Sequence, residues 1–86
     1  MSARYYRGRL EGEVHRARLR ALLLPRLFPG ALLPRHAWVG AWLGVSPSEG
    51  GRHLTRVLHE AGVTVQVCGK PRRVRVVAMP DQEMAA

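Results

Sequence analysis

The feature of this sequence that most restricts its fold is a change in the spacing of apolar residues at Gly62. Before Gly62, apolar residues recur every three or four positions, which is the period of an amphipathic helix. After Gly62 they alternate with polar residues, in "VTVQVC" and again after the turn "GKPR", which is the period of a β-strand. The sequence therefore predicts an α+β domain in which helices come first and a C-terminal β-hairpin follows.

The first helix is predicted over residues 10–24, and Pro25 ends it because proline cannot continue a helix. Its apolar stripe has helical spacing and consists of Leu10, Val14, Ala17, Ala21 and Leu24. A connector punctuated by proline and glycine comes next. We expect the apolar residues of this connector to lie against the core. These residues are Leu27, Phe28, Leu32 and Leu33.

A short second helix is predicted over residues 35–43, after Pro34. Trp38 and Trp42 are four residues apart and share one face of this helix, so we expect both indoles to be core or partly buried. Gly44 follows the last apolar residue, where a helix exit often takes a left-handed conformation.

The third helix is predicted over residues 47–61. Ser46 suits the N-cap, Pro47 the first helical position and Glu49 the third, so that "SPSE" forms a capping box. Gly62 is the stop signal. The apolar face that turns towards the core consists of Leu54, Val57, Leu58 and Ala61.

Two glycines, Gly50 and Gly51, stand in the first turns of this third helix, where each costs about 0.5–1 kcal/mol relative to alanine. One explanation is that Gly50 lies on the inner face and makes room for an indole of the second helix, while Gly51 lets the backbone approach a phosphate. The other is that "PSEGG" is an extended turn and the helix begins near Arg52. The sequence leaves both open.

The outer face of the third helix is polar and basic, and it consists of Ser48, Arg52, Thr55, Arg56 and His59. Arginine can bind guanine edges bidentately, so Arg52 and Arg56 are candidates for base contacts in the major groove of double-stranded DNA. The same composition also suits an ordinary solvated helix face, and that interpretation stays open.

The hairpin has a basic tip, which extends the candidate interface beyond the third helix. Lys70, Arg72 and Arg73 are expected to contact phosphates, and Arg75 adds a further positive charge. The chain carries a formal net charge of +8 on 86 residues. Such an excess favours a polyanionic partner, because neutralised phosphates release their counterions.

Catalysis and cofactors have little support in the sequence. The four histidines are dispersed, the single Cys68 completes no zinc pattern, and "PSEGGR" lacks the lysine and spacing of a phosphate-binding loop. We therefore expect no enzymatic activity, no metal, no cofactor and no small-molecule effector. No apolar run is long enough to span a membrane, and a cytoplasmic protein is expected.

The order of helix, connector, helix, glycine turn, helix and basic hairpin resembles the winged helix-turn-helix family. Within residues 36–79, "LGVSPSEGGRHLTRVLHEAG" resembles the reading helix of arsenic-repressor and multiple-drug-resistance type regulators. Gly44 matches the turn glycine of that motif and Gly40 the small residue four positions earlier, with one extra residue between Ser48 and Arg52. The resemblance implies a winged-helix fold and a small transcriptional regulator of phage or plasmid type.

The predicted organisation is a flexible basic arm over residues 1–9, a winged-helix domain over residues 10–79 and a short tail over residues 80–86. A protein-interaction module, for example one that binds a polymerase or a replication complex, is the main alternative, and exposure of Trp38, Trp42 or the connector would favour it. A DNA replication or recombination accessory protein and an RNA-binding protein are further alternatives. Homodimerisation through the first helix or the connector also stays open.

Overall fold

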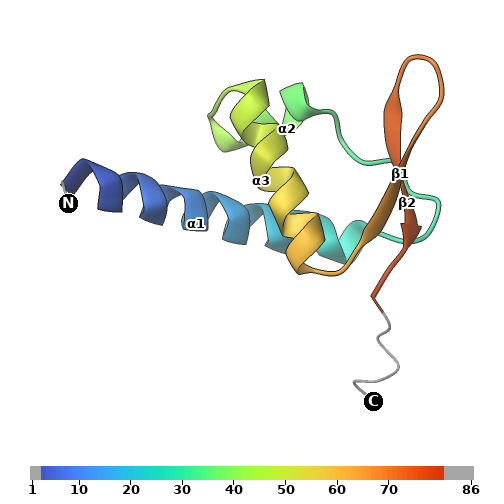
Figure 1. Cartoon of the computed structure of the whole chain (residues 1–86), viewed down its shortest axis with the longest axis horizontal. Coiled ribbons are helices and arrows are strands. Elements are labelled where there is room, and N and C mark those ends of the chain that lie inside the picture. Colours follow the sequence, from blue (N-terminus) through green and yellow to red (C-terminus); the bar gives the residue numbers. More distant parts are fainter. Residues whose placement is uncertain (1–2, 81–86) are drawn as a thin grey trace.

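A computed structural model of the chain describes residues 3–80, with side chains from residue 8 onwards. Three α-helices precede a two-stranded antiparallel hairpin, which confirms the predicted α+β class (Figure 1). The elements are α1 (Ala3–Leu23), the 3-10 turn η1 (Leu24–Arg26), α2 (His36–Leu43), α3 (Pro47–Glu60), β1 (Thr64–Cys68) and β2 (Arg73–Ala78). Residues 1–2 of the predicted arm and residues 81–86 of the predicted tail lie outside the described residues.

Helices α2 and α3 are joined by a tight turn at Gly44. This glycine has φ +80° and ψ +29°, a left-handed conformation that side chains other than glycine rarely adopt. The chain therefore leaves α2 at the predicted residue and re-enters a helix three residues later, at Pro47. The short turn holds the two helices against each other.

The two strands pair with Val65 opposite Val76 and Val67 opposite Val74, and the register shifts between Thr64 and Val65. The connector adds a third, very short strand, because Leu32 forms an isolated β-bridge with Arg75. Backbone hydrogen bonds of 2.8 Å run from Gly30, Leu33 and Val76 to carbonyl oxygens across this contact. The connector thereby ties the hairpin to the helical part of the fold.

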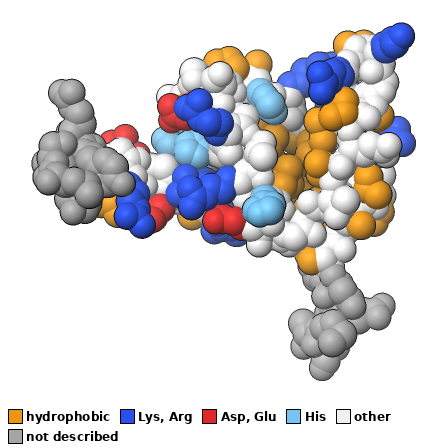
Figure 2. Space-filling model, viewed as in Figure 1, with side chains coloured by type: hydrophobic (Ala, Val, Ile, Leu, Met, Phe, Trp, Pro, Cys, Tyr) orange, Lys and Arg blue, Asp and Glu red, His pale blue; other side chains and the backbone are white. Residues whose placement is uncertain are grey.

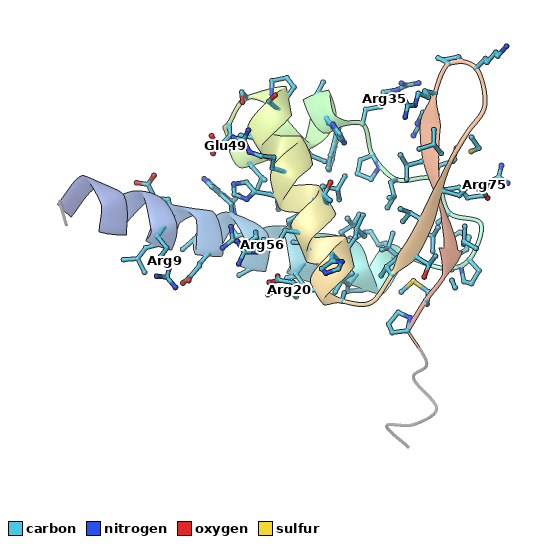
Figure 3. All side chains as sticks on the ribbon, viewed as in Figure 1. Arg9, Arg20, Arg35, Glu49, Arg56 and Arg75 are labelled. Atoms are coloured by element: carbon cyan, nitrogen blue, oxygen red, sulfur yellow. The ribbon has the colours of Figure 1, made fainter. Side chains whose placement is uncertain are left out.

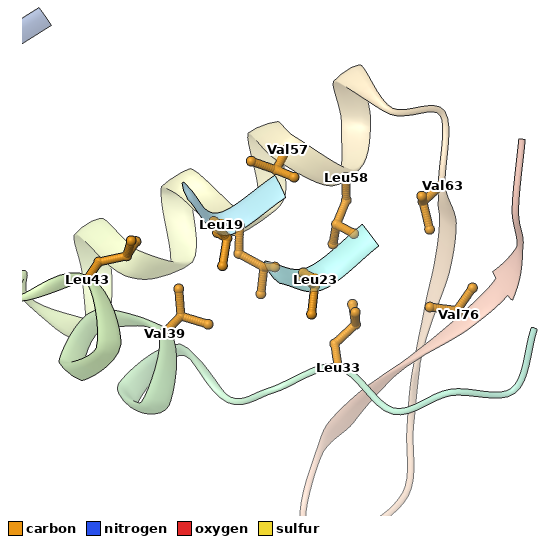
Figure 4. Packing of buried hydrophobic residues seen from close by; sticks show 10 residues of the cluster. Leu19, Leu23, Leu33, Val39, Leu43, Val57, Leu58, Val63 and Val76 are labelled. Carbon is orange, nitrogen blue, oxygen red and sulfur yellow. The ribbon is translucent and has the colours of Figure 1, made fainter. Parts of the chain in front are cut away.

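One apolar core joins all of these elements (Figure 4). Its buried residues are Leu19, Leu23, Leu33, Val39, Leu43, Leu54, Val57, Leu58, Val63 and Val76. The inner face predicted for α3 is confirmed, since Leu54, Val57 and Leu58 are buried and Ala61 packs against the cluster. The core lies at the meeting point of α2, α3, the C-terminal part of α1 and the hairpin.

The prediction for the first helix was wrong in its start and in its buried face. Helix α1 begins at Ala3 rather than at Leu10, and it takes in most of the segment predicted as an arm. Leu19 and Leu23 are buried, whereas Leu10 and Val14 are 61% and 56% exposed. Leu10 and Val14 lie on the side of α1 opposite Leu19 and Leu23, and the N-terminal half of α1 also extends past the rest of the domain (Figure 1).

Burial of the whole connector was also predicted wrongly. Leu33 is 2% exposed and Leu27 packs against the core, but Phe28 is 61% and Leu32 50% exposed. Because the connector pairs with β2 as a short strand, successive side chains point to opposite faces. Leu33 therefore points inward and Leu32 outward.

Candidate nucleic-acid interface

The capping signals of α3 place the start of this helix at Pro47. The Oγ atom of Ser46 accepts a hydrogen bond of 3.1 Å from the backbone N–H of Glu49, which satisfies one of the free donors of the first turn. Both Gly50 and Gly51 then lie inside the helix. The alternative in which "PSEGG" is an extended turn and the helix begins near Arg52 is therefore excluded.

Gly50 is needed for the close approach of α3 to α2. A Cβ atom on Gly50 would lie 2.5 Å from the backbone nitrogen and 2.7 Å from the Cα of Gly40. The expectation that Gly50 makes room for an indole was wrong, since the neighbouring group is the backbone of α2. The two helices therefore approach each other closely at this contact, to which α3 contributes Gly50 and α2 contributes Gly40.

Gly51 has a different neighbour, the imidazole of His36 at the first turn of α2. A Cβ on Gly51 would lie 2.5 Å from Nδ1 of His36, so the absent side chain lets this ring lie against α3. Gly51 is buried, and the close approach of its backbone to a phosphate stays a prediction.

The five residues predicted on the outer face of α3 are brought together on one surface. Ser48, Arg52, Thr55, Arg56 and His59 are all exposed. They line one shallow hollow together with His36 and Gly51. His36 is the residue that the sequence reasoning missed, because its position beside α3 depends on the packing of α2 and not on any local pattern.

Arg56 is held by a carboxylate on its own helix. Its Nε lies 3.4 Å from Oε2 of Glu60, one helical turn further on, while Arg20 of α1 lies 3.7 Å from Oε1 of the same residue. Figure 3 shows Arg56 and Arg20 beside the crossing of α1 and α3. These side chains are exposed, so the ion pairs are weak, and Arg56 can exchange Glu60 for a phosphate or a base edge.

His53 stands on the side of α3 that faces α1. Its Nδ1 lies 3.4 Å from the guanidinium of Arg16, and its Nε2 lies 3.7 Å from Oε2 of Glu49. Burial lowers the pKa of the His53 imidazole below its ordinary value, and the positive charge of Arg16 and the neighbouring His15 lower it further, against an opposing effect of Glu49. His53 is therefore a neutral packing residue between the helices, which is consistent with its inward position.

The cations of the hairpin have different surroundings. Lys70 and Arg72 lie exposed in the turn between the strands, as the prediction of phosphate contacts requires. Arg73 is partly buried, and its Nη2 donates a hydrogen bond of 2.9 Å to the carbonyl oxygen of Leu33. Arg73 thus braces the base of the turn against the connector, while Arg75 lies on the side of the hairpin away from α3 (Figure 3).

An apolar groove separates the basic face of α3 from the hairpin (Figure 2). Val65 and Val67 of β1 are 39% and 47% exposed in this region, opposite Leu54 and Leu58 of α3. The hairpin therefore shields the core incompletely on this side. Such a surface suits apolar contact, for example with thymine methyl groups or deoxyribose, and not an ion pair with phosphate.

The two tryptophans of α2 lie parallel to each other at a centroid distance of 6.3 Å. Trp42 is partly buried, as predicted, and the guanidinium of Arg18 lies 4.9 Å from its ring centroid. Trp38 is 49% exposed, so of the two predicted surroundings, core or partly buried, it does not have the core position. It occupies the outer side of α2, where no further layer of the described residues covers it.

Comparison with protein families, with curated proteins and with solved structures detects nothing similar to this chain. Among residues 3–80, no helix combines the length and the apolar character needed to cross a membrane. Within the same part of the chain, no three side chains of His, Cys, Asp or Glu gather closely enough to hold a metal ion.

Proposed function

We propose that this protein is a small winged-helix protein that binds double-stranded DNA, with α3 in the major groove and the hairpin tip at the backbone or the minor groove. One observation carries the proposal. The outer face of α3 presents two arginines and three hydrogen-bonding side chains on a single exposed surface, while the opposite face of the same helix is buried in the core. A helix arranged in this way can enter a groove without loss of its packing.

Within this proposal the two groups of cations have different roles. Arg52 and Arg56 bind base edges, supported by Ser48, Thr55 and His59, and they provide the sequence preference. The cations of the hairpin tip contribute affinity that does not depend on sequence. The net charge of +8 adds long-range attraction to the polyanion.

The order of elements supports the winged-helix assignment, since a helix, a connector, two helices joined at Gly44 and a basic hairpin follow one another. That order resembles the winged helix-turn-helix family, as the motif around Gly44 does. The role of transcriptional regulator follows from this family analogy and from no individual contact.

A selection of bound sequences from a random pool of DNA duplexes, at physiological salt, tests the proposal. We expect an enriched motif. Arg52→Ala and Arg56→Ala should each relax the preference at one or two positions and cost about 1–3 kcal/mol of binding to the selected duplex. Selection that enriches no motif would contradict the reading role of α3.

The hairpin tip is tested by the salt dependence of binding. Arg72→Ala should weaken binding to all duplexes alike and reduce the slope of log K against log salt by about 1. Arg75→Ala is the matched control, because it removes the same charge from the side of the hairpin that points away from α3. Equal effects of the two variants would show that DNA affinity depends on the total charge of the protein and not on the position of a cation at the hairpin tip.

A second candidate function is favoured by a specific observation, the exposure of large apolar side chains. Trp38, Phe28 and Leu32 are each about half exposed or more, as expected of a surface that docks onto another protein. In that case DNA binding should be weak, independent of sequence and lost at moderate salt. The same random-pool selection therefore distinguishes the two functions.

A further inference from the structure

Helix α1 has an apolar stripe that faces away from the core of its own domain. We call Leu10, Val14, Ala17 and Ala21 the outer stripe. All four residues are exposed, with Leu10 at 61% and Val14 at 56%. At 100° per residue the outer stripe lies opposite Leu19 and Leu23, the residues with which α1 packs into the core. Helix α1 is therefore apolar on two opposite sides.

The spacing of the outer stripe is four, three and four residues, which is the heptad pattern of a two-helix seam. A single amphipathic helix on a domain surface needs one apolar face, and α1 already has it. A second face with heptad spacing fits another helix packed along it.

The charged residues beside the outer stripe indicate which helix packs along it. Glu11 and Arg18 flank the stripe on one side, and Glu13 and Arg20 flank it on the other. The acidic residues stand near the N-terminal end and the basic ones near the C-terminal end. The flanks are thus self-complementary when two copies of α1 run in opposite directions, even though the whole chain carries a net charge of +8.

We propose that α1 pairs with α1 of a second copy of this chain in an antiparallel arrangement. Leu10 then packs on Ala21 of the second copy and Val14 on Ala17, so that each large side chain meets a small one. In this register Glu11 faces Arg18 of the second copy. This pairing rests on the geometry of α1 and is independent of DNA binding.

The second flank follows from the same register, with Glu13 opposite Arg20 of the second copy. By the two-fold symmetry each of these pairs occurs twice. A parallel arrangement brings Glu13 near Arg18 but leaves Glu11 and Arg20 without a partner across the seam. It also sets each residue against the same residue of the second copy. Leu10 then packs on Leu10 and Ala17 on Ala17, which leaves the seam unevenly filled.

The present contacts of these charged side chains do not prevent the pairing. Glu13 forms an exposed ion pair with Arg9 at 3.8 Å, and Arg20 forms one with Glu60 at 3.7 Å. Arg18 lies over the Trp42 ring, 4.9 Å from its centroid, and leaves this ring to reach Glu11 of the second copy. Exposed pairs of this kind contribute little free energy and exchange readily. The seam spans about three helical turns, so we expect a dimer that dissociates on dilution.

Sedimentation equilibrium over a series of micromolar concentrations tests the interface. We expect the wild type to shift from monomer to dimer with concentration, and Val14→Glu to remain monomeric because it places a charge in the seam. Val77→Glu is the matched control, since Val77 is a similarly exposed valine (47%) on the hairpin. A wild type that stays monomeric, or equal behaviour of the two variants, would overturn the proposal. Circular dichroism confirms that each variant is folded.

Disulfide cross-linking tests the orientation and does not depend on the folding of Val14→Glu. Leu10→Cys and Ala21→Cys are made separately, each with Cys68→Ser to remove the native thiol. In the antiparallel pair, two copies of position 10 are displaced along the helix axis by about 16 Å, beyond the reach of a disulfide. We expect covalent dimers from an oxidised mixture of the two variants and little from either alone. Efficient cross-linking of each variant with itself would show a parallel pair and contradict the proposal.

Discussion

Helices α1 and α3 both carry an apolar stripe with helical spacing, yet the stripe of α3 is buried and the predicted stripe of α1 is exposed. The difference lies in how each helix is attached. Short turns at both ends hold α3 between α2 and the hairpin, whereas α1 is attached at its C-terminal end and meets the core with the opposite side, at Leu19 and Leu23. Periodicity identifies an apolar face, and the neighbours of the helix determine whether that face is buried in its own domain.

The largest expected effect on stability distinguishes the buried side of α1 from its exposed side. Leu19→Ala removes a fully buried side chain and should lower the free energy of unfolding by about 2–5 kcal/mol. Leu10→Ala should change it by less than about 0.5 kcal/mol in dilute solution, where α1 has no partner. Urea denaturation measures both values. Comparable losses at the two positions would mean that the N-terminal half of α1 packs on its own domain.

A second test concerns the closeness of α3 to α2. Gly50→Ala gains about 1 kcal/mol of helix propensity but forces a Cβ against the backbone of Gly40, which cannot rotate away. We expect a net destabilisation of about 2 kcal/mol in urea denaturation.

Gly51→Ala is the control for this test, because its Cβ would meet the exposed ring of His36, which can turn aside. Its net effect should lie within about 0.5 kcal/mol of zero, since the propensity gain offsets the displacement. Stabilisation by Gly50→Ala would show that α2 and α3 are further apart than the contact with Gly40 implies.

The smallest expected effect is a pH dependence at the contact of α3 with α1. Because burial and Arg16 lower the pKa of His53 in the folded state, the unfolded chain binds this proton at a higher pH. The contribution of His53 is therefore fully present above about pH 6.5 and is lost as the pH falls from there towards the lowered folded pKa. Denaturation at pH 7.5 and pH 5.5 measures the difference.

His53→Gln should reduce this loss of stability at pH 5.5. His59→Gln, which alters an exposed histidine of the same helix, should keep the pH dependence of the wild type, because His53 remains in place. Equal pH profiles for the wild type and His53→Gln would show that protonation of His53 is not coupled to folding. The charged and titratable groups that face His53 are His15, Arg16 and Glu49.

Local signals in the sequence were sufficient for the elements with strong start and stop residues. Ser46, Pro47 and Glu49 predicted the start of α3, and Gly44 and Gly62 predicted turns that do have positive φ. The alternation after Gly62 predicted the hairpin, and β1 does pair with β2 in an antiparallel arrangement. These features depend on backbone geometry within a few residues, which is why they can be read without a tertiary structure.

Features that depend on distant neighbours escaped the sequence. His36 joins the surface of α3 because Gly51, fifteen positions later, leaves room for its ring. The roles of Arg73 and Leu32 depend on pairing between the connector and β2, which are about forty residues apart in the chain. The exposure of Trp38 depends on the absence of another layer over α2 in the described part of the fold.

The sequence by itself determined an α+β chain of three helices and a hairpin, a basic outer face on α3 and a strongly positive charge. Tertiary structure decided which apolar residues are buried, why the two glycines stand in α3, and which side of α1 faces outward. The physical reason is that periodicity and capping act within a helical turn, whereas burial is a property of the surfaces that happen to meet. In α1 two apolar faces compete for one core, and the sequence alone could not say which of them the core would cover.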